Sequence, residues 1–363
     1  MVLGETLAHH ARVIPHREAL LFGSARLSWR ELNQRTNRLA NALLALGARH
    51  GDRVILLLGN RAEFIEAYYA LAKIGCISAP VLPGSLASEV GFIAGSLRAR
   101  FIIAEAGAAG LVRPLQGSLD TVEAAIGLGP GHGLPHDYAE LTSQASAEEP
   151  AAKVEPDDLL TVKFTSGTTG TPKGCLRSHR NFIMAALVTC TELPLEASDS
   201  AIIATPLAAG MGISQVTMLI LKGIRIVLME KFEAGEYLDL VERERPTLGY
   251  LMDVLSRRLF AHPLFDSADL SSFRLVHGTS ARDIVDRFLS QPSFHAGLSA
   301  GFASSECGGL VSFQKPADFR QALDDPKFNH LLESVGREGP LFQVACLDDG
   351  LRPVPTGEIG ELA

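Results

Sequence analysis

The spacing of apolar residues predicts two amphipathic helices near the start of the chain. Residues 27–47 carry one apolar face, formed by Leu32, Leu39, Leu43 and Leu46 with Thr36 between them. Ser28, with Glu31 three residues later, has the spacing of a capping box and predicts the first turn of this helix. Residues 62–75 repeat the helical pattern and stop at Gly75, a residue that favours helix C-termini.

Short apolar runs alternate with these helices. They cover residues 51–59, 76–82 and 99–107, and each is bounded by glycine, charged or proline residues. A continuous apolar run of this length is typical of a strand that is buried on both faces. Alternating helices and strands predict a parallel sheet covered by helices, and we assign residues 1–125 to a first α/β half.

The alternation stops and then resumes. Residues 126–157 are rich in Gly, Pro, Ala and acidic side chains and are interpreted as a surface connection. Residues 158–332 return to the helix–strand pattern and form a second α/β half. Residues 333–363 hold short strand-like pieces between Gly, Pro and Asp-Gly turns, which predicts a small antiparallel unit. The expected fold class is therefore α/β, with two helix-covered, mainly parallel sheets packed together and a small β unit near the C-terminus.

Composition and charge narrow the function classes. The 363 residues are 47% hydrophobic, which is enough for a large core. The formal net charge of −8 argues against a general nucleic-acid or membrane-surface binder. The most apolar stretch, residues 211–229, is interrupted by Lys222 and Arg225, so we expect no membrane span. The N-terminus has no basic start before an apolar block, and the five cysteines include no C-x-x-C pair, which together favour a cytoplasmic protein.

One loop carries the clearest chemical signal. Residues 165–174 read TSGTTGTPKG, directly after the apolar run 159–164 and before a helix-like segment. Glycines let backbone N–H groups approach an anion closely, hydroxyls add hydrogen bonds, and Lys173 supplies a positive charge. The spacing differs from a Walker loop because Pro172 precedes the lysine and Gly174 follows it. The loop predicts a phosphate cradle of another kind.

This loop resembles the phosphate loop of the adenylate-forming superfamily, which includes acyl- and aryl-CoA ligases, peptide-synthetase adenylation domains and luciferases. Further segments resemble family motifs in the same order: RSHRN, HGTSARD, GFASSE, SVGREGP and PTGEIGEL. The resemblance spans nearly all of residues 1–363 and is closest to bacterial acyl- or aryl-CoA ligases. It implies the family's large N-terminal domain, which uses ATP and Mg²⁺ to activate a small carboxylic acid and then transfers the acyl group to coenzyme A.

The resemblance also implies roles for particular residues. The β- and γ-phosphates would be held by Thr165, Ser166, Gly167, Thr168, Thr169 and Gly170, with Lys173 beside them. Glu306 would coordinate Mg²⁺, with the hydroxyl of Thr165 as a second ligand. We therefore expect Lys173, Glu306 and Thr165 to be the catalytic residues of this chain.

Two further sets of residues would form the nucleotide and acid sites. The adenine walls would be Gly278, Thr279 and Ser280 on one side and Phe302, Ala303, Ser304 and Ser305 on the other. Phe302 stands where the family usually has tyrosine, so stacking is kept and the phenol hydrogen bond is lost. The acid pocket would be lined by Ala208, Ala209, Gly210 and Met211. This segment has no acidic residue to pair with an ammonium group, so an α-amino acid substrate is disfavoured.

Several alternatives stay open at this point. The acyl acceptor could be a carrier-protein thiol instead of coenzyme A, and a non-catalytic nucleotide- or acyl-binding protein would share the same cradle. Self-association into a homodimer also stays open. A dinucleotide-binding oxidoreductase is disfavoured because no G-x-G-x-x-G opens a strand–helix unit. The family's mobile C-terminal domain is not found in these 363 residues, so we expect this polypeptide by itself to fold but to adenylate poorly.

Overall fold

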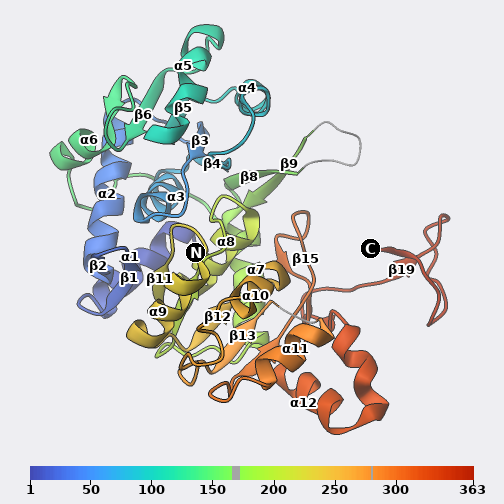
Figure 1. Ribbon diagram of the computed structural model, residues 1–363. Coiled ribbons are helices and arrows are strands. Elements are labelled where there is room, and N and C mark those ends of the chain that lie inside the picture. The colour runs from blue at the N-terminus through green and yellow to red at the C-terminus, as the bar shows by residue number, and fades with distance from the viewer. Residues whose placement is uncertain (166–171, 279–280) are drawn as a thin grey trace.

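The computed structural model describes residues 1–165, 172–278 and 281–363. Over these residues the chain forms two seven-stranded sheets and three small two-stranded antiparallel sheets. Helices lie between the two large sheets and on their outer faces, so the body is a stack of layers (Figure 1). This arrangement confirms the α/β class with two mainly parallel, helix-covered sheets.

The first large sheet has the strand order β7-β6-β5-β3-β4-β8-β9, in which every described pair except β8–β9 is parallel. Its strands are β3 (Arg53–Leu57), β4 (Ile77–Pro80), β5 (Phe101–Glu105), β6 (Ala124–Leu128), β7 (His136–Asp137), β8 (Leu159–Thr165) and β9 (Lys173–Ser178). Val54 and Leu56 of β3 face the central core, whereas Ile55 and Leu57 face the outer helices. Both faces are buried, which is why residues 54–57 are all apolar.

The second large sheet has the order β14-β13-β12-β10-β11-β1-β2, with β1–β2 as its antiparallel pair. Its strands are β1 (Glu18–Phe22), β2 (Ala25–Ser28), β10 (Ser200–Ile203), β11 (Arg225–Leu228), β12 (Leu248–Tyr250), β13 (Leu275–His277) and β14 (Gly297–Ser299). β10 lies at the middle of the sheet, with β11 on one side and β12 on the other.

The largest core lies between the two sheets and takes side chains from both of them. The helices that fill this layer are α1 (Leu3–Val13), α2 (Trp29–Ala45), α3 (Ala62–Ile74), α7 (His179–Glu192) and α8 (Gly210–Lys222), with α6 (Tyr138–Gln144) packed against α2. Trp29, Tyr68 and Tyr69 are fully buried here. Burial of such large apolar surfaces holds the two sheets together as one unit.

Two smaller cores cover the outer faces of the sheets. The first sheet is covered by α4 (Ala87–Leu97), η1 (Ala106–Ala108) and α5 (Ala109–Ser118). The second sheet is covered by α9 (Ala234–Glu244), α10 (Asp253–Phe260), α11 (Arg282–Leu289), α12 (Pro316–Asp324) and η2 (Pro326–Glu333). Among the described residues, each helix is either too short or too polar to cross a lipid bilayer.

The two helices predicted from periodicity form as expected. At the start of α2, the Glu31 backbone N–H donates to the Ser28 hydroxyl at 3.3 Å, and the Ser28 N–H donates to the Glu31 carboxylate at 2.8 Å. The Ser28 hydroxyl, at 2.7 Å, and the Ser28 backbone N–H both donate to the Glu31 carboxylate and lower its pKa. The helix α3 ends at Gly75, whose φ of 70° places it in the left-handed region that glycine adopts without strain.

The boundaries predicted for the two halves do not coincide with the two sheets. β1 and β2 lie within residues 1–125 but belong to the second sheet, because β1 pairs with β11. β8 lies after residue 158 but belongs to the first sheet, because it pairs with β4. Each half of the chain therefore contributes one pair of strands to the sheet of the other half. Pairing between distant segments determines this exchange, and local sequence does not.

Residues 126–157 are more than a surface connection. They contain the end of β6, the strand β7 and the helix α6. The segment that follows α6 is fastened to α2 and α3: Asn37 donates to the Ala147 carbonyl at 2.9 Å, and the buried Lys73 ammonium contacts the Glu149 carboxylate at 2.6 Å. These elements were not predicted from the sequence, because β7 and α6 are short and contain few apolar residues.

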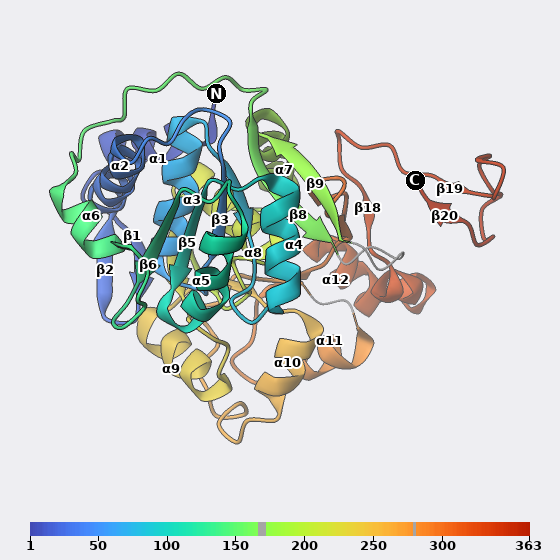
Figure 2. The ribbon, with the colours of Figure 1, turned by 90° about the horizontal axis from the view of Figure 1, so that it is seen from above.

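The C-terminal part forms small antiparallel sheets, as predicted. β15 (Ala303–Ser304) pairs with β16 (Gly309–Leu310), β17 (Ser312–Phe313) with β18 (Arg337–Glu338), and β19 (Cys346–Leu347) with β20 (Glu361–Leu362). The β17–β18 pair crosses the boundary predicted at residue 333. Figures 1 and 2 show β19 and the C-terminus apart from the two large sheets.

Candidate active site

A cavity of about 440 Å³ opens at the carboxyl ends of the parallel strands of the second sheet. Tyr250 at the end of β12 and His277 at the end of β13 line it, together with Ala208 from the segment after β10. Because β11 and β12 flank β10 on opposite sides, the chain leaves β10 and β12 in opposite directions. In open α/β sheets such a switch in strand order is the usual place for a ligand.

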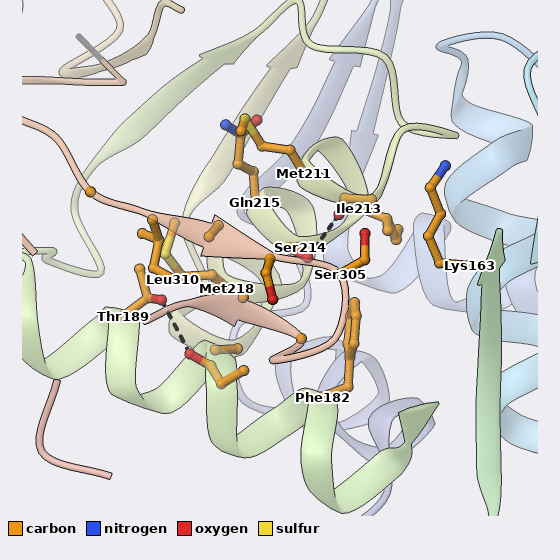
Figure 3. A pocket seen from close by; sticks show the side chains of 18 of the residues that line it. Lys163, Phe182, Thr189, Met211, Ile213, Ser214, Gln215, Met218, Ser305 and Leu310 are labelled. Atoms are coloured by element: carbon orange, nitrogen blue, oxygen red, sulfur yellow. Dashed lines mark hydrogen bonds between the residues drawn. The ribbon is translucent and has the colours of Figure 1, made fainter. Parts of the chain in front are cut away.

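The cavity has three further walls, which are α7, α8 and the β15–β16 hairpin. Figure 3 shows Phe182 of α7 pointing toward Ser305 of the hairpin, with Lys163 on the same side of the view. Leu310 and Met218 lie toward the other end of the cavity. Ser305 and Lys163 thus lie toward one end of the cavity, and Leu310 and Met218 toward the other.

Most of the residues predicted for the adenine and acid sites share this cavity. Those that line it are Ala208, Gly210, Met211, Gly278, Phe302, Ala303, Ser304 and Ser305. Ala209 does not line it and instead precedes the first residue of α8. The predicted residues Ser166, Gly167, Thr168, Thr169, Gly170, Thr279 and Ser280 lie outside the described residues. Segments that are about 100 residues apart in sequence, 208–211 and 302–305, are therefore brought together.

The ends of the phosphate-loop segment form a strand pair. Thr165 ends β8 and faces Lys173, which begins β9. The expected helix does not follow the loop directly, because residues 173–178 hydrogen-bond to β8 as β9 before α7 begins at His179. Ser178 caps this helix by accepting a hydrogen bond from the Asn181 N–H at 3.2 Å. Lys173 is exposed and Thr165 is half-buried.

The predicted metal residue lies beside this strand pair. Glu306 is exposed between β15 and β16, and its Oε1 lies 3.9 Å from the Sγ of Cys175 on β9. Cys175 and Lys173 are two residues apart and point to the same face of β9, so their Cα atoms are separated by about 7 Å. The structure thus brings Glu306, Lys173 and Thr165 to one rim of the cavity region.

The donor set at this rim fits a magnesium ion that is held jointly with phosphates. No group of three or more His, Cys, Asp or Glu side chains able to hold an ion occurs within the described parts of the chain. Mg²⁺ commonly binds through one or two carboxylates together with substrate phosphates and water. One carboxylate, Glu306, and one hydroxyl, Thr165, are therefore suitable protein donors for an ion that arrives with a nucleotide.

Comparison with known proteins assigns the family. The AMP-binding enzyme family matches residues 7–363 of the chain. The chain belongs to this family. Among its relatives is the feruloyl-CoA synthase of an Amycolatopsis species, which is 32% identical over 99% of this chain and 69% of that protein. This confirms the adenylate-forming superfamily, with similarity to acyl- and aryl-CoA ligases.

Solved structures of AMP-binding enzymes share the fold. The inhibitor-bound N-terminal domain of FACL13 from Mycobacterium tuberculosis superimposes with a TM-score of 0.89 at 27% identity, covering 99% of this chain and 88% of that one. The anthranilate CoA ligase AuaEII in complex with anthranoyl-AMP has a TM-score of 0.91 at 23% identity, covering 100% of this chain and 69% of that one. At that identity the second likeness shows the fold alone.

Two basic residues of this AMP-binding domain line the cavity and were not predicted as site residues. Lys163 on β8 is half-buried and donates to the Ala208 carbonyl at 2.8 Å, and burial lowers its pKa. Arg177 on β9 is buried. A sequence signal did exist, since Lys163 interrupts an apolar run and Arg177 is the first residue of the RSHRN motif.

The sheet end of the cavity is uncharged at neutral pH. His277 is buried, and its Nδ1 lies 3.0 Å from the Ser299 hydroxyl oxygen. Burial lowers the pKa of His277 to about 4, so its ring is neutral at pH 7. Tyr250 packs edge-on to this ring at 5.9 Å between centroids. The AMP-binding domain therefore presents an aromatic, neutral floor beside Gly278.

Proposed function

We propose that this chain is the large N-terminal part of an ATP-dependent carboxylate–CoA ligase. The observation that supports this most is the single cavity that joins the predicted adenine wall, Phe302 to Ser305, to the predicted acid segment around Ala208 and Met211. An adenine site and an acid site in one cavity suit a reaction that joins the two ligands. The rim beside Glu306 and Lys173 supplies the place for the triphosphate.

The proposed chemistry follows from the charges of the reactants. A carboxylate oxygen attacks the α-phosphorus of ATP, the bond to pyrophosphate breaks, and an acyl-adenylate forms. Both reactants are anions, so Lys173 and the phosphate-loop segment would reduce their repulsion and stabilise the departing pyrophosphate. Mg²⁺ at Glu306 and Thr165 would neutralise charge on the phosphates. The thiol of coenzyme A then takes the acyl group and releases AMP.

The acid that fits this cavity has an apolar or aromatic tail and no cationic group. Met218 and Leu310 line the end away from Ser305, and Leu193 also lines the cavity. No Asp or Glu lines the cavity within the described residues, whereas Lys163 and Arg177 do. An ammonium group would meet only like charge there, which argues against α-amino acids. Feruloyl-CoA synthase, the relative at 32% identity, is named for an aromatic acid.

The test is thioester formation by the full-length polypeptide that contains this chain. We expect ATP-dependent release of pyrophosphate and formation of a CoA thioester with one member of a panel of hydroxycinnamic, benzoic and fatty acids. A carrier protein bearing a phosphopantetheine thiol, supplied in place of coenzyme A, would identify the other acceptor. Because the chain spans 69% of its feruloyl-CoA synthase relative, we expect the 363 residues alone to exchange pyrophosphate poorly. Nucleotide binding without turnover by the full-length protein would favour a non-catalytic binder.

Replacing Lys173 by Ala is expected to weaken binding of a non-hydrolysable ATP analogue by about 10- to 100-fold, because a charge-assisted contact to phosphate is lost. Lys173 is exposed, so the variant should fold normally. AMP, which lacks the β- and γ-phosphates, should bind equally well to both proteins. Calorimetry on the 363-residue chain measures both affinities, and Lys153→Ala, an exposed lysine paired with Glu155 outside the cavity, is the control. Unchanged affinity for the analogue would remove Lys173 from the phosphate site.

A further inference from the structure

Arg177 is a buried cation that forms no direct ion pair, and the Glu306 carboxylate acts on it only at longer range. Its side chain is 6% exposed and lines the cavity. Its Nη1 donates to the Asn181 side-chain oxygen at 3.2 Å, and its Nη2 has no hydrogen-bond partner among the described residues. None of the ion pairs found in the described parts of the chain includes Arg177. The guanidinium therefore keeps one buried donor without a partner, on a residue that lines the cavity.

A buried charge of this kind is unfavourable unless a ligand supplies an opposite charge and a hydrogen-bond acceptor. Transfer of an unpaired guanidinium out of water costs free energy that a single hydrogen bond to a neutral amide does not recover. Burial lowers the pKa of Arg177 accordingly, although arginine remains protonated at neutral pH. An anionic ligand would supply both the missing charge and the missing acceptor.

The residues around Arg177 indicate which anionic group of the ligands would bind to it. Arg177 is four residues from Lys173 on β9, about 13 Å along the strand, so it lies well inside the rim where the triphosphate would bind. It lies two residues before the first residue of α7, beside Gly308. Gly308 has a φ of +86°, and a Cβ added there would lie 3.0 Å from the Arg177 Cζ. Glycine at this position thus lets the β15–β16 hairpin close over the guanidinium.

The apolar part of the cavity begins next to Arg177. Asn181 and Phe182 occupy the first turn of α7, and Thr189 follows two turns later, about 10 Å further along the helix. An acid with its carboxylate at Arg177 would therefore extend its tail along α7 toward Leu310. The planar fork of a guanidinium also matches a carboxylate better than it matches a ring or an alkyl tail.

We propose that Arg177 binds the reacting carboxylate of the acid substrate and positions it between the nucleotide rim and the apolar end of the cavity. The inference rests on the proposed ligase function. One carboxylate oxygen would accept the hydrogen bond of Nη2, while the other attacks the α-phosphorus and the pyrophosphate leaves with the electron pair of the broken P–O bond. Arg177 transfers no proton in this step; it holds the acid and offsets the repulsion between two anions.

The variants Arg177→Gln and Arg177→Lys test this role. Gln removes the charge and keeps hydrogen-bonding capacity, whereas Lys keeps the charge and loses the fork. Arg180→Gln is the matched control, because Arg180 lies three residues further along, in the first turn of α7, is exposed and forms an ion pair of 2.6 Å with Asp157. Neither Arg180 nor Asp157 lines the cavity. Removing an unpaired buried charge should leave the midpoint of thermal unfolding unchanged or raise it, so a folding failure is not expected.

The measurement is calorimetric binding to the 363-residue chain of ferulate, decanoate and the uncharged amide of each acid. Arg177→Gln is expected to weaken binding of the acid that wild type prefers by about 10- to 100-fold, and Arg177→Lys by less. Binding of the amide and of AMP should be unchanged in both variants. The acid-to-amide ratio reports the charge contact itself, which a merely structural role of Arg177 would not change.

Three results would overturn the proposal. Equal acid binding by wild type and Arg177→Gln would show that the guanidinium does not hold the carboxylate. Weaker binding of AMP or an ATP analogue, with acid binding unchanged, would assign Arg177 to phosphate. A loss seen only with 4-carboxycinnamate, which has a second carboxylate, would assign Arg177 to that group. If no acid binds wild type although AMP does, the ligase function fails together with this inference, and that result is distinct from the other three.

Discussion

Replacing Glu306 by Gln in the full-length protein is expected to reduce acid-dependent pyrophosphate exchange by about 10²- to 10³-fold, the range found when one electrostatic stabiliser of a transition state is removed. The substitution keeps the size of the side chain and removes the negative charge that a hard cation requires. Glu306 is exposed between two short strands and contacts only the Cys175 thiol in the described structure, so the fold should not change.

The dependence on Mg²⁺ concentration makes this prediction specific. In the wild type the rate should saturate with Mg²⁺, and in Glu306→Gln saturation should require at least 10-fold more metal, since a charged ligand contributes roughly 1.5–3 kcal/mol. Glu358→Gln, at an exposed turn remote from the cavity lining, is the control and should behave as wild type. A Glu306→Gln enzyme with the wild-type Mg²⁺ profile would refute the metal assignment.

The spacing of apolar residues correctly predicted those elements that are determined by local sequence. The helices α2 and α3 follow from apolar spacing, a capping box at Ser28 and a glycine terminus at Gly75, all of which act within a few residues. The pairing of β1 with β11 and of β8 with β4 depends on contacts between segments far apart in sequence. For that reason the two sheets were predicted, but the exchange of strand pairs between them was not.

The candidate site was predicted from one loop and from the family motifs that follow it in the sequence. The cavity adds further residues that these motifs do not identify. The predicted segments 208–211 and 302–305 do share a cavity. Lys163 interrupts the apolar pattern of β8, and Arg177 is a buried cation in the mostly exposed β9; such exceptions are expected where binding, rather than stability, selects a residue. The pairing of β8 with β9 brings Thr161 opposite Arg177, and it was not predicted because a helix-like segment was expected directly after the loop.

Acidification from pH 7 to 4.5 is expected to destabilise the chain by about 5 kcal/mol through two histidines. His179 and His277 are both buried, and burial lowers the pKa of each to about 4. In the unfolded chain their pKa is about 6.5, so the unfolded state binds more protons between pH 6.5 and 4. Stability is therefore fully present above pH 6.5 and decreases as the pH falls toward 4, by about 2 to 3 kcal/mol for each histidine at pH 4.5.

His179 allows a clean test because its contacts are known. Its Nδ1 accepts a hydrogen bond from the Leu3 N–H at 3.0 Å, which requires the neutral ring, and its Nε2 is buried without a partner in the described structure. His179→Asn keeps an acceptor for Leu3 and cannot be protonated. Urea unfolding followed by circular dichroism should give this variant about half the wild-type loss between pH 7 and 4.5. The exposed His16→Asn should reproduce the wild-type loss.

Two strongly shifted carboxyls act in a lower pH window than the histidines. The carboxyls of Glu244 and Asp269 have pKa values lowered to about 2, chiefly by hydrogen bonds from Arg26 and from Ser271 respectively. Their contribution is present above about pH 4.5 and disappears only below it. A loss of several kcal/mol against a typical domain stability of about 5–15 kcal/mol would bring the chain near unfolding at pH 4.5. Identical pH slopes for wild type and His179→Asn would show that His179 is accessible to protons in the folded state.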